Sequence, residues 1–147
     1  MMDIDTDVRM MVSRWIVETT RAPAIAQVAA RTGHGVDGVR ESYRRLQDKR
    51  LLVVESDGET VRMAPPFSAV PTQHRVHVGP REYFANCAWD ALGIPAALGR
   101  KGTVHSRCEQ SFAPLTIEVD ENGPAPVPCV IHFAVPAAQW WEDIVFT

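Results

Sequence analysis

The residue pattern changes at Pro65-Pro66, and this change limits the folds open to the chain. Before the two prolines, apolar residues mostly recur every three or four positions, which is the period of amphipathic helices. After them, several segments alternate apolar and polar residues, as strands do. Because consecutive prolines interrupt regular structure, the sequence predicts two domains, at residues 1–66 and 67–147.

Three helices and a hairpin are predicted for the first domain. Helical spacing covers residues 5–20, 24–32 and 36–49, and two short apolar runs then flank Asp57-Gly58, a strong hairpin signal. This order is typical of a winged-helix domain, which binds DNA through its third helix or serves only as a structural module. The acidic residues of the third helix dilute its positive charge and favour the structural module.

An α+β fold is predicted for the whole chain, with a small mixed or antiparallel sheet around one helix in the second domain. The helix is expected to span residues 79–102, because proline is well tolerated at a first helical position, here Pro80. Pro95 is expected to bend or end it. The expected strands are residues 72–78, 103–108, 115–119, 128–135 and 143–147.

Cys87 and Asp90 lie near the centre of the predicted helix. Three residues apart on one helical face, their Cβ atoms would be about 5–6 Å from each other. A thiol would then lie beside a carboxyl group, whose pKa burial would raise, so that it could deliver a proton near neutral pH. Alternatively, Cys87 is a small buried apolar residue, and about two turns from the helix start it gains little from the helix dipole.

The other cysteines are Cys108 and Cys129. Three cysteines at irregular spacing predict free thiols in a reducing compartment. The pairs His105–Cys108 and Cys129–His132 are poor chelates, because residues three apart on a strand point to opposite faces. We expect no cofactor, since the sequence has no phosphate-binding loop and no known catalytic metal motif.

Composition narrows the class of protein further. Apolar residues make up 46% and charged residues 22%, which predicts a globular chain. A net charge of −3 argues against a nucleic-acid partner bound through overall charge. The N-terminal residues begin with acids and contain no uninterrupted apolar run, so we expect a cytoplasmic protein without a signal peptide or membrane span.

The segment YFANCAWDALGIPAALG at residues 83–99, with the following 103–108 and 113–115, resembles the organomercurial (alkylmercury) lyases, which cut carbon–mercury bonds. The helical pattern of residues 5–64 is similar to that family's N-terminal region. The resemblance implies that Cys87 attacks mercury, that Asp90 passes a proton to the departing carbon, and that Cys108 is mainly structural. It also implies an organomercurial substrate, Hg(II) as product and small-molecule thiols as partners.

The resemblance further implies a second catalytic cysteine after a segment similar to residues 140–147, and the sequence ends at Thr147. We therefore expect a form shortened before that cysteine, a protein that works without that thiol, or one that no longer carries out this chemistry. The candidates to replace the missing thiol are Cys129, a small-molecule thiol and a partner. The alternative function is a winged-helix regulator or soft-metal sensor without turnover, indicated by the pattern of residues 5–64 and by Arg40, Arg44 and Arg45.

Overall fold

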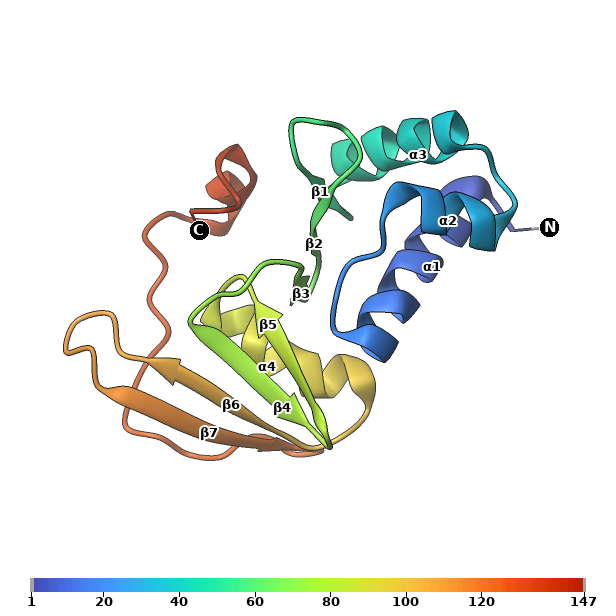
Figure 1. Ribbon diagram of the computed structural model, residues 1–147. Coiled ribbons are helices and arrows are strands. Elements are labelled where there is room, and N and C mark those ends of the chain that lie inside the picture. Colours follow the sequence, from blue (N-terminus) through green and yellow to red (C-terminus); the bar gives the residue numbers. More distant parts are fainter. Residues whose placement is uncertain (1, 147) are drawn as a thin grey trace. The chain divides into compact units, whose positions relative to one another are not determined.

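The N-terminal helices form where the sequence places an apolar stripe. In the computed structural model, which describes residues 2–146, these helices are α1 (Ile4–Thr19), α2 (Ile25–Thr32) and α3 (Val36–Asp48) (Figure 1). Their buried residues recur at helical spacing, as in Val8, Val12 and Ile16 of α1. The three predicted helices are confirmed.

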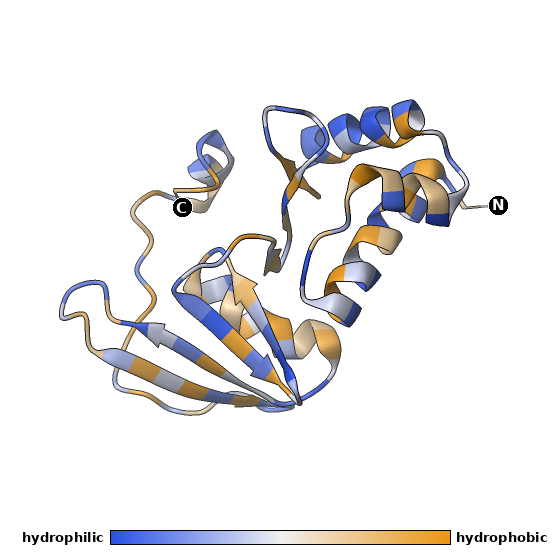
Figure 2. Ribbon diagram, viewed as in Figure 1, coloured by the Kyte–Doolittle hydropathy of each residue, from blue (hydrophilic) through white to orange (hydrophobic). Residues whose placement is uncertain are grey.

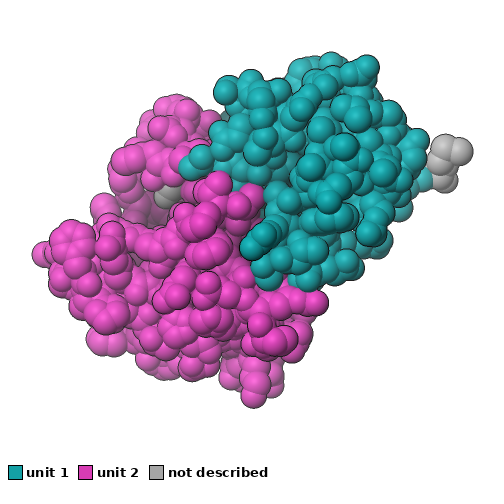
Figure 3. All heavy atoms as spheres, in the orientation of Figure 1, with its two compact units in different colours: residues 1–65 teal, residues 66–147 magenta. Residues whose placement is uncertain are grey.

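A short hairpin follows α3. Strands β1 (Val53–Val54) and β2 (Val61–Ala64) pair in antiparallel fashion, as predicted. The turn between them is fixed by Asp57, whose carboxylate accepts hydrogen bonds from the amides of Glu59 and Thr60, both at 2.8 Å. These elements belong to the first of two compact units, residues 1–65 and 66–147 (Figure 3). Their assignment as a winged-helix-like domain stays a prediction.

The second unit contains an antiparallel sheet with the strand order β3-β5-β4-β6-β7-β8. Its strands are β3 (Phe67–Ser68), β4 (His74–Val78), β5 (Arg81–Ala85), β6 (Gly102–Arg107), β7 (Pro114–Asp120) and β8 (Gly123–Pro124). Along β4 and β6 apolar and polar residues alternate (Figure 2), and Val76, Val78 and Val104 are buried. The helix α4 (Ala88–Leu98) packs on this apolar face. The α+β class predicted from the sequence is confirmed.

The predicted helix at residues 79–102 is wrong in its first half. Gly79 and Pro80 form a two-residue turn that joins β4 to β5, with Val78 opposite Arg81 and Gly79 at φ +58°. Tyr83 and Phe84 have high strand propensity, and pairing with β4 buries every second residue of β5, which outweighs the helix signal of Pro80. Pro95 does not end α4, which continues to Leu98.

The two strands predicted nearest the C-terminus are also wrong. Between residues 125 and 146 the chain forms only the 3₁₀ helix η1 (Ala137–Glu142), and Thr147 lies outside the described residues. Prolines at 124, 126, 128 and 136 remove backbone donors that a strand would need. The segment is organised by side chains instead: Phe133 stacks on Trp140 with ring centroids 4.7 Å apart, and the Trp140 indole N–H donates to the carbonyl of Val135.

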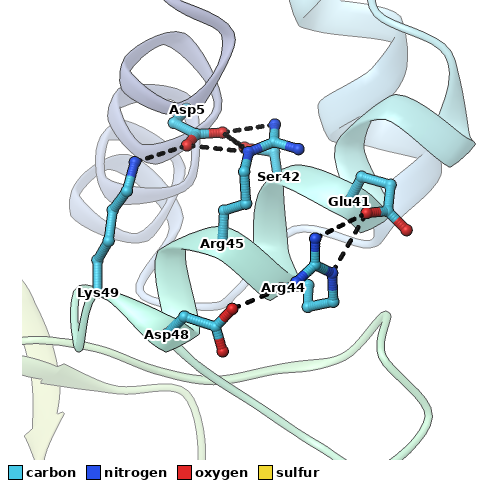
Figure 4. Close-up of polar contacts among 7 residues, drawn as sticks. All are labelled: Asp5, Glu41, Ser42, Arg44, Arg45, Asp48 and Lys49. Carbon is cyan, nitrogen blue, oxygen red and sulfur yellow. Dashed lines mark hydrogen bonds and ion pairs between the residues drawn. The ribbon is translucent and has the colours of Figure 1, made fainter.

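Asp5 joins α1 to α3 in the first unit. Its buried carboxylate accepts hydrogen bonds from Ser42 at 2.8 Å, Arg45 at 2.8 Å and Lys49 at 2.9 Å (Figure 4). Two cations and a hydroxyl therefore compensate one carboxylate that is 5% exposed.

Of the helices in residues 2–146, none is both long enough and apolar enough to cross a membrane.

Candidate active site

Cys87 lies at the junction of β5 and α4. It is the N-cap residue of α4, with an extended backbone at φ −140° and ψ 172°. The sequence-based placement two turns inside a helix is therefore wrong, because the strand β5 occupies the residues before it. At the N-cap, the thiol lies near the free amide groups and the positive end of the helix dipole, which favour a thiolate.

Asp90 occupies the first turn of α4, three residues after Cys87. Both side chains are half-buried. Burial raises the pKa of Asp90 above its ordinary value of 3.8, and the neighbouring Cys87 thiol opposes part of this increase. A raised pKa is what the sequence analysis required if Asp90 is to hold and deliver a proton near neutral pH.

The pKa of the Cys87 thiol is also raised. Burial is the main cause, and the nearby Asp90 carboxylate adds to it by repulsion of the thiolate. The amides of Asp90 and Trp89 act in the opposite direction, because they stabilise negative charge on sulfur. Burial thus favours the protonated form of both the thiol and the carboxyl group.

Two neighbours of Cys87 shape its surroundings. Asn86 donates a side-chain hydrogen bond of 2.8 Å to the carbonyl of Ile144, which ties the residue before the thiol to the C-terminal segment. Trp89 is 60% exposed, an unusual position for so large an apolar side chain. The contact of Asn86 could not be predicted from the sequence, because no local pattern signals a contact across 58 residues.

Cys108 follows the end of β6 and is half-buried, and Cys129 is exposed in the irregular segment after β8. All three cysteines are free thiols. The hydroxyl of Ser111, helped by the amides of Ser111 and Gln110, lowers the pKa of Cys108. Within residues 2–146, no three His, Cys, Asp or Glu side chains are grouped so that they could hold a metal ion.

The arginines of α3 form ion pairs with acidic side chains, and Figure 4 shows those of Arg44 and Arg45. Their partners are Asp37 and Glu59 for Arg40, Glu41 and Asp48 for Arg44, and Asp5 for Arg45. A helix that reads DNA must offer such side chains to phosphates and bases. These ion pairs do not favour the regulator as an alternative function.

Comparison with known proteins gives one consistent family. The profile of the alkylmercury lyase family matches residues 67–147. An alkylmercury lyase of Streptomyces lividans is 30% identical over 121 residues, which are 80% of this chain and 54% of the relative. One from Bacillus cereus is 28% identical over 98 residues, 67% of this chain and 43% of the relative. The chain thus spans about half the length of the curated relatives it matches.

A solved structure shows the same fold. The mercury-bound form of MerB2 superposes with a TM-score of 0.61 at 21% identity, covering 84% of this chain and 66% of the other. At this identity the likeness concerns the fold, while the sequence matches identify the family. The chain belongs to the alkylmercury lyase family.

Proposed function

We propose that this protein cleaves the carbon–mercury bond of organomercurials, with Cys87 as the residue that binds mercury and Asp90 as the proton donor. One observation carries the proposal: the thiol and the carboxyl group share the first turn of α4, half-buried, with the pKa of each raised by burial. The family to which the chain belongs supports it.

The proposed reaction depends on the affinity of a soft thiolate for soft mercury and on the transfer of one proton from Cys87 through Asp90 to carbon. Thiolate is the softest protein ligand, and mercury in R–Hg–SR′ is a very soft ion, so sulfur adds to the metal readily. As the Cys87 sulfur bonds to mercury, its proton passes to the carboxylate of Asp90. The electron pair of the carbon–mercury bond then takes this proton, which releases R–H and leaves mercury bound to Cys87 and to the thiolate R′S⁻.

In this scheme the second thiolate on mercury arrives with the substrate. Atoms and charge balance without a further residue: Cys–SH and R–Hg–SR′ give R–H and Cys–S–Hg–SR′. A second small-molecule thiol then exchanges onto mercury and frees Cys87. Cys108 has a structural role in the turn after β6 and does not bind mercury in this cycle.

Hydrocarbon release tests the activity. Purified protein is incubated with an organomercurial and excess thiol, and R–H is measured by gas chromatography against a Cys87→Ser control. We expect release only with the unchanged chain. Release no greater than that of the control would overturn the proposal.

A second experiment identifies the second thiolate. A preformed thiol adduct of the organomercurial is supplied at one equivalent, without free thiol, to the unchanged chain and to Cys129→Ser. We expect equal single-turnover release from both, because the adduct supplies the second sulfur. Loss of turnover in Cys129→Ser alone would assign that role to Cys129 and reject the external thiolate.

A further inference from the structure

Two histidine side chains, which could serve as metal ligands, lie together on the sheet face opposite α4. Side chains alternate along β4 and β6, so that Val76 and Val104 face the helix while His77 and His105 face away from it. On this outer face the two imidazole rings meet edge to face, with centroids 5.0 Å apart. The proposed lyase chemistry does not use either ring.

One nitrogen of each ring faces a polar side chain on a neighbouring strand. Nε2 of His77 lies 2.6 Å from Oε2 of Glu82 on β5, and Nδ1 of His105 lies 3.5 Å from the hydroxyl of Thr116 on β7. The other nitrogen of each ring, Nδ1 of His77 and Nε2 of His105, makes no hydrogen bond within residues 2–146. Imidazoles that bind metals commonly have the arrangement seen at His77, with the second nitrogen fixed by a carboxylate.

Charged groups of both signs surround the two rings. Glu82 lies directly opposite His77, and Glu118 on β7 reaches the hydroxyl of Thr103, the residue opposite His77 on β6. Two arginines share this face: Arg75, directly opposite His105, lies 3.6 Å from Glu82, and Arg107 lies two residues after His105 on β6. They offset the charge of the two carboxylates. His77 is 43% exposed, so an ion can reach the rings from solvent.

We propose that His77 and His105 bind one divalent transition-metal ion of the zinc, copper or nickel type, with Glu82 as the residue that orients His77. Imidazole nitrogen is a preferred ligand of these ions. Two protein ligands leave coordination positions for water, so this is an open surface site and differs from a closed four-ligand structural zinc site. Because α4 covers the other face, the site is separate from Cys87.

Calorimetric titration with Zn²⁺ tests the site on the full chain. We expect the unchanged protein and a His34→Gln control to bind one equivalent more than His77→Gln or His105→Gln. His34 is a matched control, since its ring is also paired with a carboxylate, Asp7 at 3.1 Å, and is found in the other unit. Zinc binding by thiols is the same in all four proteins and cancels in the comparison.

Two further variants sharpen the test. Glu82→Gln is expected to keep the stoichiometry and to weaken Zn²⁺ binding about 10- to 100-fold. The double variant of His77 and His105 is expected to bind no less Zn²⁺ than either single variant, because one lost ligand already breaks the chelate. Identical isotherms for the unchanged protein and for a folded His77→Gln or His105→Gln would overturn the proposal, as would a loss of this equivalent in Cys87→Ser.

Discussion

Burial at the start of α4 raises the pKa of both Cys87 and Asp90, and the proposed reaction depends on the protonation of both groups. A thiol that stays protonated attacks mercury slowly unless a neighbour accepts its proton. Asp90 is close enough to do so, and its raised pKa lets it pass the proton on. The two residues are therefore expected to fail in different ways when each is replaced.

The variant Asp90→Ala should separate mercury binding from bond cleavage. The Cys87 thiol remains and can lose its proton to solvent, so one equivalent of organomercurial should still attach, although more slowly. Hydrocarbon release should fall about 10²- to 10⁴-fold, the usual contribution of a general acid. Mass spectrometry of the adduct and gas chromatography of R–H measure the two steps. Equal loss of attachment and release would contradict the role given to Asp90.

The rate of hydrocarbon release should depend on pH through the one proton that Cys87 and Asp90 share. Cleavage needs one proton shared between thiol and carboxyl, and that proton is lost as pH rises through the raised pKa of Cys87, whose ordinary value is 9.0. Single-turnover release should therefore persist through neutral pH and decline only above pH 9.0. An alkaline decline centred below this value would show that Asp90 does not share the thiol proton.

At the scale of elements, the sequence predicted the N-terminal helices better than it predicted the junction of β5 and α4, where Cys87 lies. The N-terminal helices could be predicted because their apolar stripes are local. The β5–α4 junction could not, since the strand propensity of Tyr83 competes with the helix signal of Pro80, and pairing with β4 decides between them. Cys87 and Asp90 were predicted as neighbours, because three residues separate them in the sequence, while the N-cap position of Cys87 depends on where β5 ends.

Packing of α4 on the sheet is tight at Gly102. A Cβ there would lie 2.8 Å from the carbonyl oxygen of His77 and 3.1 Å from the Pro95 ring. Gly102→Ala should therefore destabilise the fold by about 1–3 kcal/mol, the usual cost of overpacking. The control Gly93→Ala, where the nearest atom is 4.0 Å away, should stabilise α4 by up to ~1 kcal/mol. Urea unfolding compares the two, and equal effects would refute this account.

The link between α1 and α3 gives a second prediction at this scale. Hydrogen bonds and ion pairs from Arg45 and Lys49 hold the pKa of Asp5 far below its usual value of 3.8. Asp5→Asn should lower the free energy of unfolding at neutral pH by about 2 kcal/mol, as for a hydrogen bond to a charged group. Because both cations are partly exposed, we expect no larger Coulomb contribution.

The lowered pKa of Asp5 determines how its contribution to the free energy of unfolding changes with pH. Stabilisation by Asp5 is fully present above pH 3.8 and is lost as pH falls below it toward the pKa in the folded state. The difference between the unchanged protein and Asp5→Asn should therefore shrink in acid, as measured by urea midpoints. A difference that stays constant below pH 3.8 would show that packing, and not charge, accounts for it.

At the scale of the whole molecule, the charge pattern predicts behaviour toward nucleic acid. The net charge is −3, and the arginines of α3 already face carboxylates. We expect fluorescence anisotropy to show no salt-sensitive binding to a random pool of duplex DNA, because the net negative charge and the carboxylates beside these arginines repel phosphate. Binding that weakens steeply with added salt would restore the regulator as an alternative.

The fold class of the whole chain was predictable, but its C-terminal quarter was not. Periodicity identified both the helical and the strand-rich half, since these patterns are local. The strand-like composition of residues 143–146 was misleading, because a strand forms only where a partner edge is available. Here Asn86 holds the carbonyl of Ile144 and Asp143 accepts from the amide of Phe146.

The two-faced sheet also determines where the chain tolerates a change of length. In β4 and β6, inserting or deleting one residue would exchange the faces, exposing Val76 and turning His77 toward α4. Such a frame change would disrupt the helix packing and the histidine pair at once. In the turn between β7 and β8, an added residue displaces no buried side chain, so length variation among related chains should concentrate there.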